Sequence, residues 1–258
     1  MTITNAITKA EQFIWLNDKC LDKQSIMTRR ELFYQNCPHH IMLDDFLNTN
    51  VLLKITKALA SSHLWKQQRH LYGQHYVNEE EWQDSKKLQF VQRNEWVEPG
   101  EQLPAESGDV ILRRLLDFLR GESFFEFLKD LTGLPLCLSA HRKDNTKLFS
   151  CGSQDFIGEH KDNSLNRELC LLLYLSPNWS QDDGGHLCFR GRGSDPINYP
   201  PLFNRCVLFA PASAGASHWI TSVRGGAGQP HCVDVSGNNS EIRQQKMRYN
   251  VTSWYYSK

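Results

Sequence analysis

The sequence predicts a single α+β domain over residues 1–258, in which a mainly helical first half supports a strand-rich second half. In residues 1–134, apolar side chains recur at helical spacing. From Pro135 onward, the chain breaks into short apolar runs bounded by Gly, Pro, Asn, Asp or Ser, which is typical of antiparallel strands joined by turns. An open sheet, a sandwich or a barrel would each fit this pattern, with the helices packed against it.

Three helices are expected in the first half. Residues 44–62 begin with an acidic candidate for the N-cap and continue with one apolar face. Residues 109–121 and 122–133 repeat the pattern, and each ends at a glycine that can stop a helix. The connection over residues 63–108 is polar and rich in Gln, Glu and Trp, and it ends in a loop. Each helix should therefore place its apolar face on a shared core.

Apolar runs of the second half predict the strands. Their lengths suit strands, and turn-forming residues separate them. They cover residues 136–142, 168–176, 186–191, 205–212, 217–223 and 248–256.

Composition indicates an ordinary soluble protein. The 29 basic and 29 acidic residues cancel, so no overall field attracts nucleic acid or an anionic membrane. The chain lacks a cationic start followed by an apolar run, and no segment approaches ~18 consecutive apolar residues. The eight cysteines are scattered without a C-x-x-C pair, so we expect reduced thiols. These features predict a cytoplasmic protein that binds neither nucleic acid nor membrane, and they leave its oligomeric state open.

His160 and Asp162 form a possible metal-binding pair in "GEHKDNS". On a strand, two such side chains project from the same face, ~6.5 Å apart, and one ion can bridge them. A mononuclear non-haem iron site needs two imidazoles and one carboxylate. His218, in the strand-like run 217–223, is the best candidate for the second imidazole. Because a His-x-Asp triplet is common by chance, its weight depends on the motifs that follow it.

Those motifs resemble the iron(II)- and 2-oxoglutarate-dependent oxygenases, in particular their prolyl-hydroxylase-like branch. The family pattern has H-x-D-N, a downstream Arg, a Tyr-Leu-x-x-x-Trp strand, Gly-Gly-x-Leu, a strand ending in Phe, H-x-V-x-x-V and R-Y-x-[IV]-T-x-W. All appear here in order over residues 135–258, with Trp219-Ile220 in place of the usual x-Val. The matching segments are "GEHKDNSLNRELCLLLYLSPNW" (158–179), "DDGGHLCF" (182–189), "NRCVLF" (204–209), "SHWITSV" (217–223) and "RYNVTSWYY" (248–256).

The resemblance implies a double-stranded β-helix (jelly-roll or cupin-like) core buttressed by the N-terminal helices, with His160, Asp162 and His218 as the iron ligands. Arg248 then corresponds to the cation that binds the distal carboxylate of 2-oxoglutarate, a role that suits a rigid guanidinium in a closed pocket. Tyr174 corresponds to a tyrosine that adds a hydrogen bond to that carboxylate, and Thr252 lies on the same side of its strand as Arg248.

Arg167 and Trp254 are weaker candidates, for contacts with substrate. Trp254 would wall the pocket or simply belong to the core, and Arg167 would face substrate or anchor the loop after Asn163. The implied cofactor is Fe(II), with 2-oxoglutarate and O2 as cosubstrates and ascorbate as a candidate reductant. Because Asp162 is intact, hydroxylation of an unactivated C–H bond is favoured over halogenation.

The substrate is less determined than the chemistry. We favour a free or carrier-bound amino acid or a small peptide-like metabolite; the alternatives are a prolyl or other residue of a protein, or a non-catalytic β-barrel binding module. Residues 149–150 replace a tyrosine that the family often has, and residues 224–246 are longer than the usual turn, which suggests a lid. Arg69, Arg93 and Arg142 are conceivable partners for a substrate carboxylate.

Overall fold

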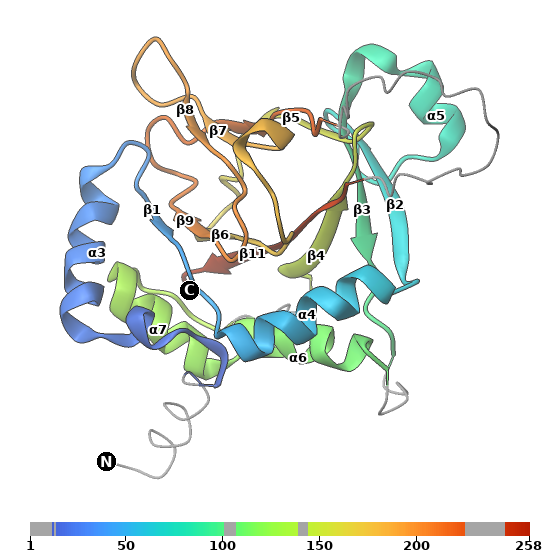
Figure 1. The fold of residues 1–258 in the computed structure, drawn as a ribbon. Helices are drawn as coiled ribbons and strands as arrows, with labels where there is room; N and C mark the ends of the chain where they lie inside the picture. The colour runs from blue at the N-terminus through green and yellow to red at the C-terminus, as the bar shows by residue number, and fades with distance from the viewer. Residues whose placement is uncertain (1–11, 13, 101–106, 139–143, 225–245) are drawn as a thin grey trace, which may run out of the picture.

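The strands form one antiparallel 11-stranded sheet that curls into a barrel-like shell (Figure 1). This computed structural model describes residues 12, 14–100, 107–138, 144–224 and 246–258. The strand order is β1-β9-β6-β11-β4-β3-β5-β10-β7-β8, and β2 pairs with β3. The strands are β1 (His40–Leu43), β2 (Trp65–Leu71), β3 (Gln89–Trp96), β4 (Thr146–Cys151), β5 (Phe156–His160), β6 (Arg167–Tyr174), β7 (Leu187–Phe189), β8 (Ile197–Tyr199), β9 (Cys206–Phe209), β10 (His218–Ile220) and β11 (Arg248–Tyr256).

Strand β3 joins the two walls of the shell. Its residues Asn94 and Glu95 pair with β4, whereas Val91 and Gln92 pair with β5. The wall β1-β9-β6-β11-β4 thereby continues into the wall β5-β10-β7-β8. Helices cover the outside of the first wall, as Figure 1 shows for α4 and α6. This arrangement is the expected double-stranded β-helix with supporting helices.

Side-chain alternation along β6 separates two hydrophobic cores. Leu169, Leu171 and Leu173 face the helices, where they join the larger core. Cys170 and Leu172 face the interior of the shell with the smaller core. Because both faces are covered, β6 is apolar along almost its whole length, as a strand of this kind should be.

The two helices expected before Gly121 and Gly133 are confirmed. They are α6 (Asp109–Leu119) and α7 (Glu122–Thr132), and Gly133 ends α7 in the left-handed conformation with φ 73°. The other helices are α2 (Asp18–Leu21), α3 (Lys23–Gln35), α4 (Thr49–Ser61) and α5 (Glu79–Asp84), with short 3-10 turns at Lys86–Leu88 and Gln181–Asp183.

The expected start of the helix in residues 44–62 was wrong. Helix α4 begins at Thr49, and Asn48 caps it by accepting a hydrogen bond from the backbone N–H of Asn50. The residues before it follow the end of β1 at Leu43, and Leu47 among them forms an isolated bridge with Leu16. Asp44 instead accepts a hydrogen bond from Arg205 at 2.6 Å.

Five of the six predicted strands are present as β6, β7, β9, β10 and β11. Residues 136–142 are different: Cys137 forms only an isolated bridge with Tyr256, and residues 139–143 lie outside the described part. Strands β2 and β3 occupy the polar connection where none was expected. Their inward residues include Gln68, His70 and Arg93, so the apolar alternation that identifies a strand is missing.

None of the helices in the described ranges is long and apolar enough to cross a membrane. The cysteines that the structure describes are all free thiols, as expected.

Candidate active site

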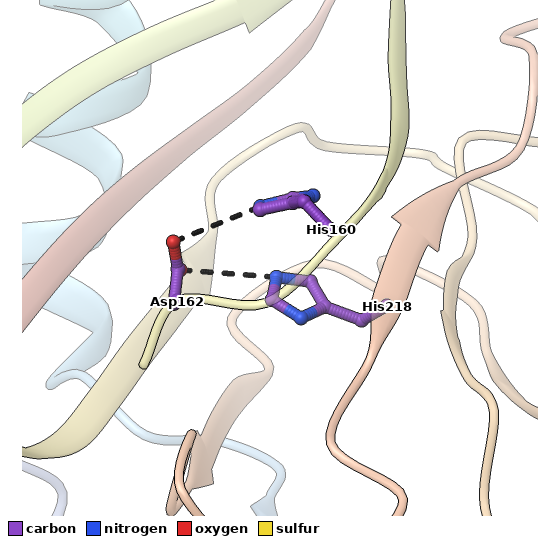
Figure 2. Close-up of side chains that lie close together, drawn as sticks. All are labelled: His160, Asp162 and His218. Atoms are coloured by element: carbon purple, nitrogen blue, oxygen red, sulfur yellow. Dashed lines mark ion pairs between the residues drawn. The ribbon is translucent and has the colours of Figure 1, made fainter. Parts of the chain in front are cut away.

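Two strands and the turn that follows one of them bring His160, Asp162 and His218 together (Figure 2). His160 ends β5 and His218 begins β10, and the two are direct partners in the antiparallel ladder. The distances from their Nε2 atoms to the Asp162 carboxylate oxygens are 3.7 and 3.8 Å. One potential ligand atom from each residue lies within 4.8 Å of the others. A transition-metal ion with ligand bonds of about 2 Å fits between such atoms.

Backbone carbonyls fix the tautomer of both imidazoles. The Nδ1 of His160 lies 2.9 Å from the carbonyl oxygen of Gly158, and the Nδ1 of His218 lies 3.0 Å from that of Ala216. Because a carbonyl can only accept, each Nδ1 carries the proton and each Nε2 keeps its lone pair for a metal. Burial, reinforced by the nearby His160, lowers the pKa of His218 to about 4, so this imidazole is neutral at pH 7.

Asp162 lies two residues beyond the end of β5, and side chains from other strands hold it. The indole Nε1 of Trp254 donates to its Oδ2 at 2.8 Å, and Arg167 donates to its backbone oxygen at 2.9 Å. Burial acts to raise the pKa of Asp162, but His218, His160, the Trp254 hydrogen bond and Arg167 together lower it. The carboxylate is therefore ionised, and the donor set of two imidazoles and one carboxylate fits iron(II).

A small cavity runs from these three residues to Arg248 on β11. Arg248 is 1% exposed, and its guanidinium donates to the Gly185 carbonyl and to Asn250 Oδ1, each at 2.9 Å. No carboxylate in the described residues pairs with it, and its Nε has no partner. A buried cation without an anion is unfavourable, so this end of the cavity fits an anionic group.

Tyr174 and Thr252 lie beside Arg248. The Tyr174 ring centroid is 5.7 Å from the Arg248 guanidinium carbon; its buried hydroxyl has no hydrogen-bond partner, and it does not line the cavity. Burial raises the pKa of this tyrosine to about 12. Thr252 does line the cavity, and its oxygen accepts from Asn250 Nδ2 at 3.0 Å. The hydroxyl proton of Thr252 therefore remains available to an acceptor in the cavity.

A larger cavity of about 570 Å³ adjoins the small one. His160, Asp162, Arg93 and Trp254 line both cavities, so a molecule in the larger one would lie next to the histidine–aspartate cluster. Its outer wall comes from the loop after β2, which includes Tyr72 and other aromatic residues. This volume suits a molecule of amino-acid or short-peptide size.

Arg167 and Trp254, considered above for substrate, border the larger cavity, and both make polar contacts to Asp162; Arg167 also donates to the Tyr256 hydroxyl. Both donate hydrogen bonds to the carboxylate, and the Arg167 guanidinium lies 5.1 Å from the Trp254 ring centroid. These contacts hold Asp162, and whether Arg167 or Trp254 also contacts substrate stays a prediction.

The other residues singled out from the sequence differ in whether they line the larger cavity. Phe149, where a tyrosine is usual, lines the larger cavity, whereas Arg69 pairs with Glu79 and does not line it. Arg142 and almost all of the suggested lid, residues 224–246, lie outside the described residues. Sequence reasoning missed Asn250, which connects Arg248 to Thr252. The alternation of β11 could have found it, since it lies between those two residues on the same face.

Comparisons with known proteins agree with this geometry. Residues 146–256 match the family model described as the 2OG-Fe(II) oxygenase superfamily. Residues 10–198, more than half of the chain, match the model described as "Oxoglutarate and iron-dependent oxygenase degradation C-term". A search of curated protein sequences gives no significant match.

Solved structures share the fold at low sequence identity. A prolyl hydroxylase from Trichoplax adhaerens, in complex with a hypoxia inducible factor peptide fragment, has a TM-score of 0.58 at 16% identity, covering 91% of this chain and 90% of that one. A Pseudomonas putida prolyl-4-hydroxylase has a TM-score of 0.55 at 13% identity, covering 90% and 99%. A 2OG-Fe(II) oxygenase family oxidoreductase from Burkholderia pseudomallei has a TM-score of 0.54 at 15% identity, covering 90% of each.

The predicted enzyme class, fold and cofactors are thereby confirmed: this is a dioxygenase that uses Fe(II), 2-oxoglutarate and O2. The chain belongs to the 2OG-Fe(II) oxygenase superfamily.

Proposed function

We propose that this enzyme hydroxylates an unactivated C–H bond of a free or carrier-bound amino acid or a small peptide-like metabolite. The observation that carries the proposal is the cavity of about 570 Å³ that His160 and Asp162 line. A substrate there would lie beside the metal ligands.

In this proposal, His160, Asp162 and His218 bind iron, and Arg248 binds the distal carboxylate of 2-oxoglutarate. The fixed Nε2 lone pairs support the first assignment, and the buried Arg248 without an acidic partner supports the second. Tyr174 and Thr252 add hydrogen bonds to the same carboxylate, because each has a hydroxyl proton without an acceptor among the described residues.

Iron and 2-oxoglutarate, when bound, supply the oxidising chemistry that breaks the C–H bond. The chain's own residues orient the reactants and exclude water. Trp254 and Arg167 hold Asp162 in one orientation, and Asn250 holds the Arg248 guanidinium. Apolar side chains between the two ends of the small cavity keep it dry; they are Ile157, Leu172, Phe209 and Ile220. Such a dry site strengthens every charged interaction inside it.

Residues 1–258 act as one domain in this proposal. Two observations support it: β1 from the first half pairs with β9, and β3 pairs with both β4 and β5. The first half therefore completes the sheet as well as supplying helices.

A prolyl residue of a peptide or protein is the second candidate substrate. It is favoured by the similarity to prolyl hydroxylases, one of which is described with a bound peptide fragment. Exposed aromatic residues at the outer wall of the larger cavity, Tyr72 and Tyr76, offer a surface on which a peptide could lie.

Anaerobic titration of the full chain with Fe(II) and 2-oxoglutarate tests the ligand assignments. Wild type should develop the weak visible charge-transfer band of an iron–2-oxoglutarate complex. Asp162→Ala should lose it, and Arg248→Gln should bind 2-oxoglutarate at least about 10-fold more weakly because a charged hydrogen-bond partner is removed. The matched control is Asp195→Ala, at an exposed loop position. A band that persists in Asp162→Ala would contradict the assignment.

Succinate release then separates the substrate classes. Free amino acids, their carrier-bound thioesters and proline-containing peptides are compared under identical conditions. Turnover by peptides alone would replace the first candidate by the second.

A further inference from the structure

We propose that Arg93 binds a carboxylate group of the substrate, so that the enzyme oxidises an acidic molecule or residue. This inference rests on the proposed function, because it names the chemistry of the molecule that enters the same site. Arg93 has no part in the proposed binding of iron or of 2-oxoglutarate.

The backbone places Arg93 where the two walls of the shell separate. The residues before it, Val91 and Gln92, pair with β5, and those after it, Asn94 and Glu95, pair with β4. Arg93 itself has a ladder partner only on β2, at Gln68. It lines both cavities with His160 and Asp162. A group held by Arg93 would therefore lie beside the metal ligands.

Arg93 forms no salt bridge with a described residue, although the charges of Glu95 and Asp162 act on it electrostatically. Its guanidinium also makes no hydrogen bond within the described part of the chain, and its Nε is shut off from solvent without a partner. The guanidinium packs against the Phe149 ring, whose centroid is 3.4 Å from the guanidinium carbon. An arginine keeps its charge even when buried, so an enclosed guanidinium of this kind is unfavourable until an anion binds.

The nearest acids have other partners. Glu95 pairs with Lys147 at 2.8 Å, and Asp162 accepts from Trp254 and Arg167. The other arginines of the two cavities are also accounted for, since Arg167 is bound to Asp162 and Arg248 is bound to Gly185 and Asn250. Arg93 is thus the arginine of these cavities, within the described residues, that makes neither a hydrogen bond nor an ion pair; Lys161, which also lines the larger cavity, is exposed to solvent.

A carboxylate fits this cation better than a neutral group, because a guanidinium can donate two parallel hydrogen bonds to it. The α-carboxylate of a free amino acid and the side chain of an Asp or Glu in a peptide share this chemistry. Amidation removes the α-carboxylate of a free amino acid but leaves the side-chain carboxylate of an Asp or Glu in place. The experiment uses this difference to tell the two sources apart.

Ligand-induced thermal stabilisation measures the interaction without turnover. The full chain is loaded with Mn(II) and 2-oxoglutarate, and the midpoint of thermal unfolding is recorded at increasing concentrations of each probe. The probes are the proteinogenic amino acids with their C-terminal amides, and capped peptides containing Asp or Glu with their Asn or Gln counterparts. At least one carboxylate probe should bind, and its neutral counterpart should bind at least about 30-fold more weakly.

Variants at position 93 test whether Arg93 causes the preference for the acid probe over its neutral counterpart. Arg93→Gln should bind the acid and its neutral counterpart equally, and Arg93→Lys should restore part of the difference because it keeps the charge. Arg69→Gln is the matched control on the adjacent strand, outside both cavities, and should behave as wild type. The unfolding midpoint of each variant without Mn(II) and 2-oxoglutarate shows whether it folds. If Arg93→Gln does not fold, the inference is tested by the binding of Arg93→Lys and by the comparison of acid and neutral probes in wild type.

The outcomes separate the two proposals. If Mn(II) and 2-oxoglutarate fail to stabilise wild type, the proposed function fails. If they do stabilise it, the Arg93 inference is overturned by three results: no carboxylate probe binds, acid and neutral probes bind equally, or Arg93→Gln keeps the preference. Weaker 2-oxoglutarate binding by Arg93→Gln also overturns it, because Arg93 would then serve the cosubstrate.

Discussion

The helix-facing core and the interior of the shell share the strand β6 but bury different kinds of side chain. On the helix side, Leu169, Leu171 and Leu173 pack with the apolar faces of the helices. On the inner side, Cys170 and Leu172 line a cavity that also contains His218 and Arg248. One strand can serve both because its side chains alternate. Stability is therefore concentrated on one face of the sheet and chemistry on the other.

Adjacent leucines give the largest test of this difference. Leu171→Ala should lower the free energy of unfolding by about 2–5 kcal/mol, because it leaves a void in a closed core. Leu172→Ala should lower it by less, since its side chain already borders a cavity, but should reduce turnover of the folded enzyme. Urea unfolding and succinate release measure the two effects. Equal losses of stability, or a greater loss of turnover in folded Leu171→Ala, would show that the two faces are not separate.

Trp254→Phe tests how the inner face holds its carboxylate. The substitution removes the hydrogen bond to Asp162 but keeps an aromatic ring. Loss of a partner that orients a metal ligand typically weakens metal binding by about 10–100-fold. Iron affinity from competition with a chelator should fall by that factor, while the unfolding midpoint without metal should change little. Unchanged iron affinity would mean that Asp162 is oriented without Trp254.

Acidification should affect the inner face more than the helix side. Burial lowers the pKa of His218 and of His70 to about 4, from an ordinary value of 6.5. Below pH 6.5 the unfolded chain binds protons that the folded chain refuses until about pH 4, so stability is present at pH 7 and falls across this window. Each histidine should contribute about 1–2 kcal/mol of that fall between pH 7 and 5.

The histidine contributions can be measured by urea unfolding at pH 7 and pH 5. His218→Gln and His70→Gln should each lose less stability on acidification than wild type does. His63→Gln, at an exposed position, is the control and should follow wild type. If either variant loses as much stability between pH 7 and pH 5 as wild type does, the histidine that it replaces is not a cause of the acid sensitivity.

Sequence patterns predicted the parts of the site that lie on regular apolar strands. His218 and Arg248 could be located because the segments that form β10 and β11 have the family spacing. Asp162 was expected on a strand with His160, but β5 ends at His160, and tertiary hydrogen bonds determine the position of the carboxylate.

Strands β2 and β3 escaped prediction for a physical reason. Their inner faces line a polar cavity, so Gln68, His70 and Arg93 occupy positions that an ordinary strand would give to apolar side chains. The feature that hid these strands is also the one that makes them relevant to substrate. Contacts between distant segments, such as Asp44 with Arg205, likewise leave no local pattern.

The pairing of His160 with His218 has a consequence for which ions the site accepts. Cross-strand partners keep their Cα atoms about 4.5–5.5 Å apart, so the backbone ladder sets the separation of these two ligands. Asp162 lies outside the ladder, and its position is set by side-chain hydrogen bonds from Trp254 and Arg167, which adjust more easily than backbone pairing. A change of ionic radius, as from iron to manganese or cobalt, would therefore be accommodated mainly by the carboxylate.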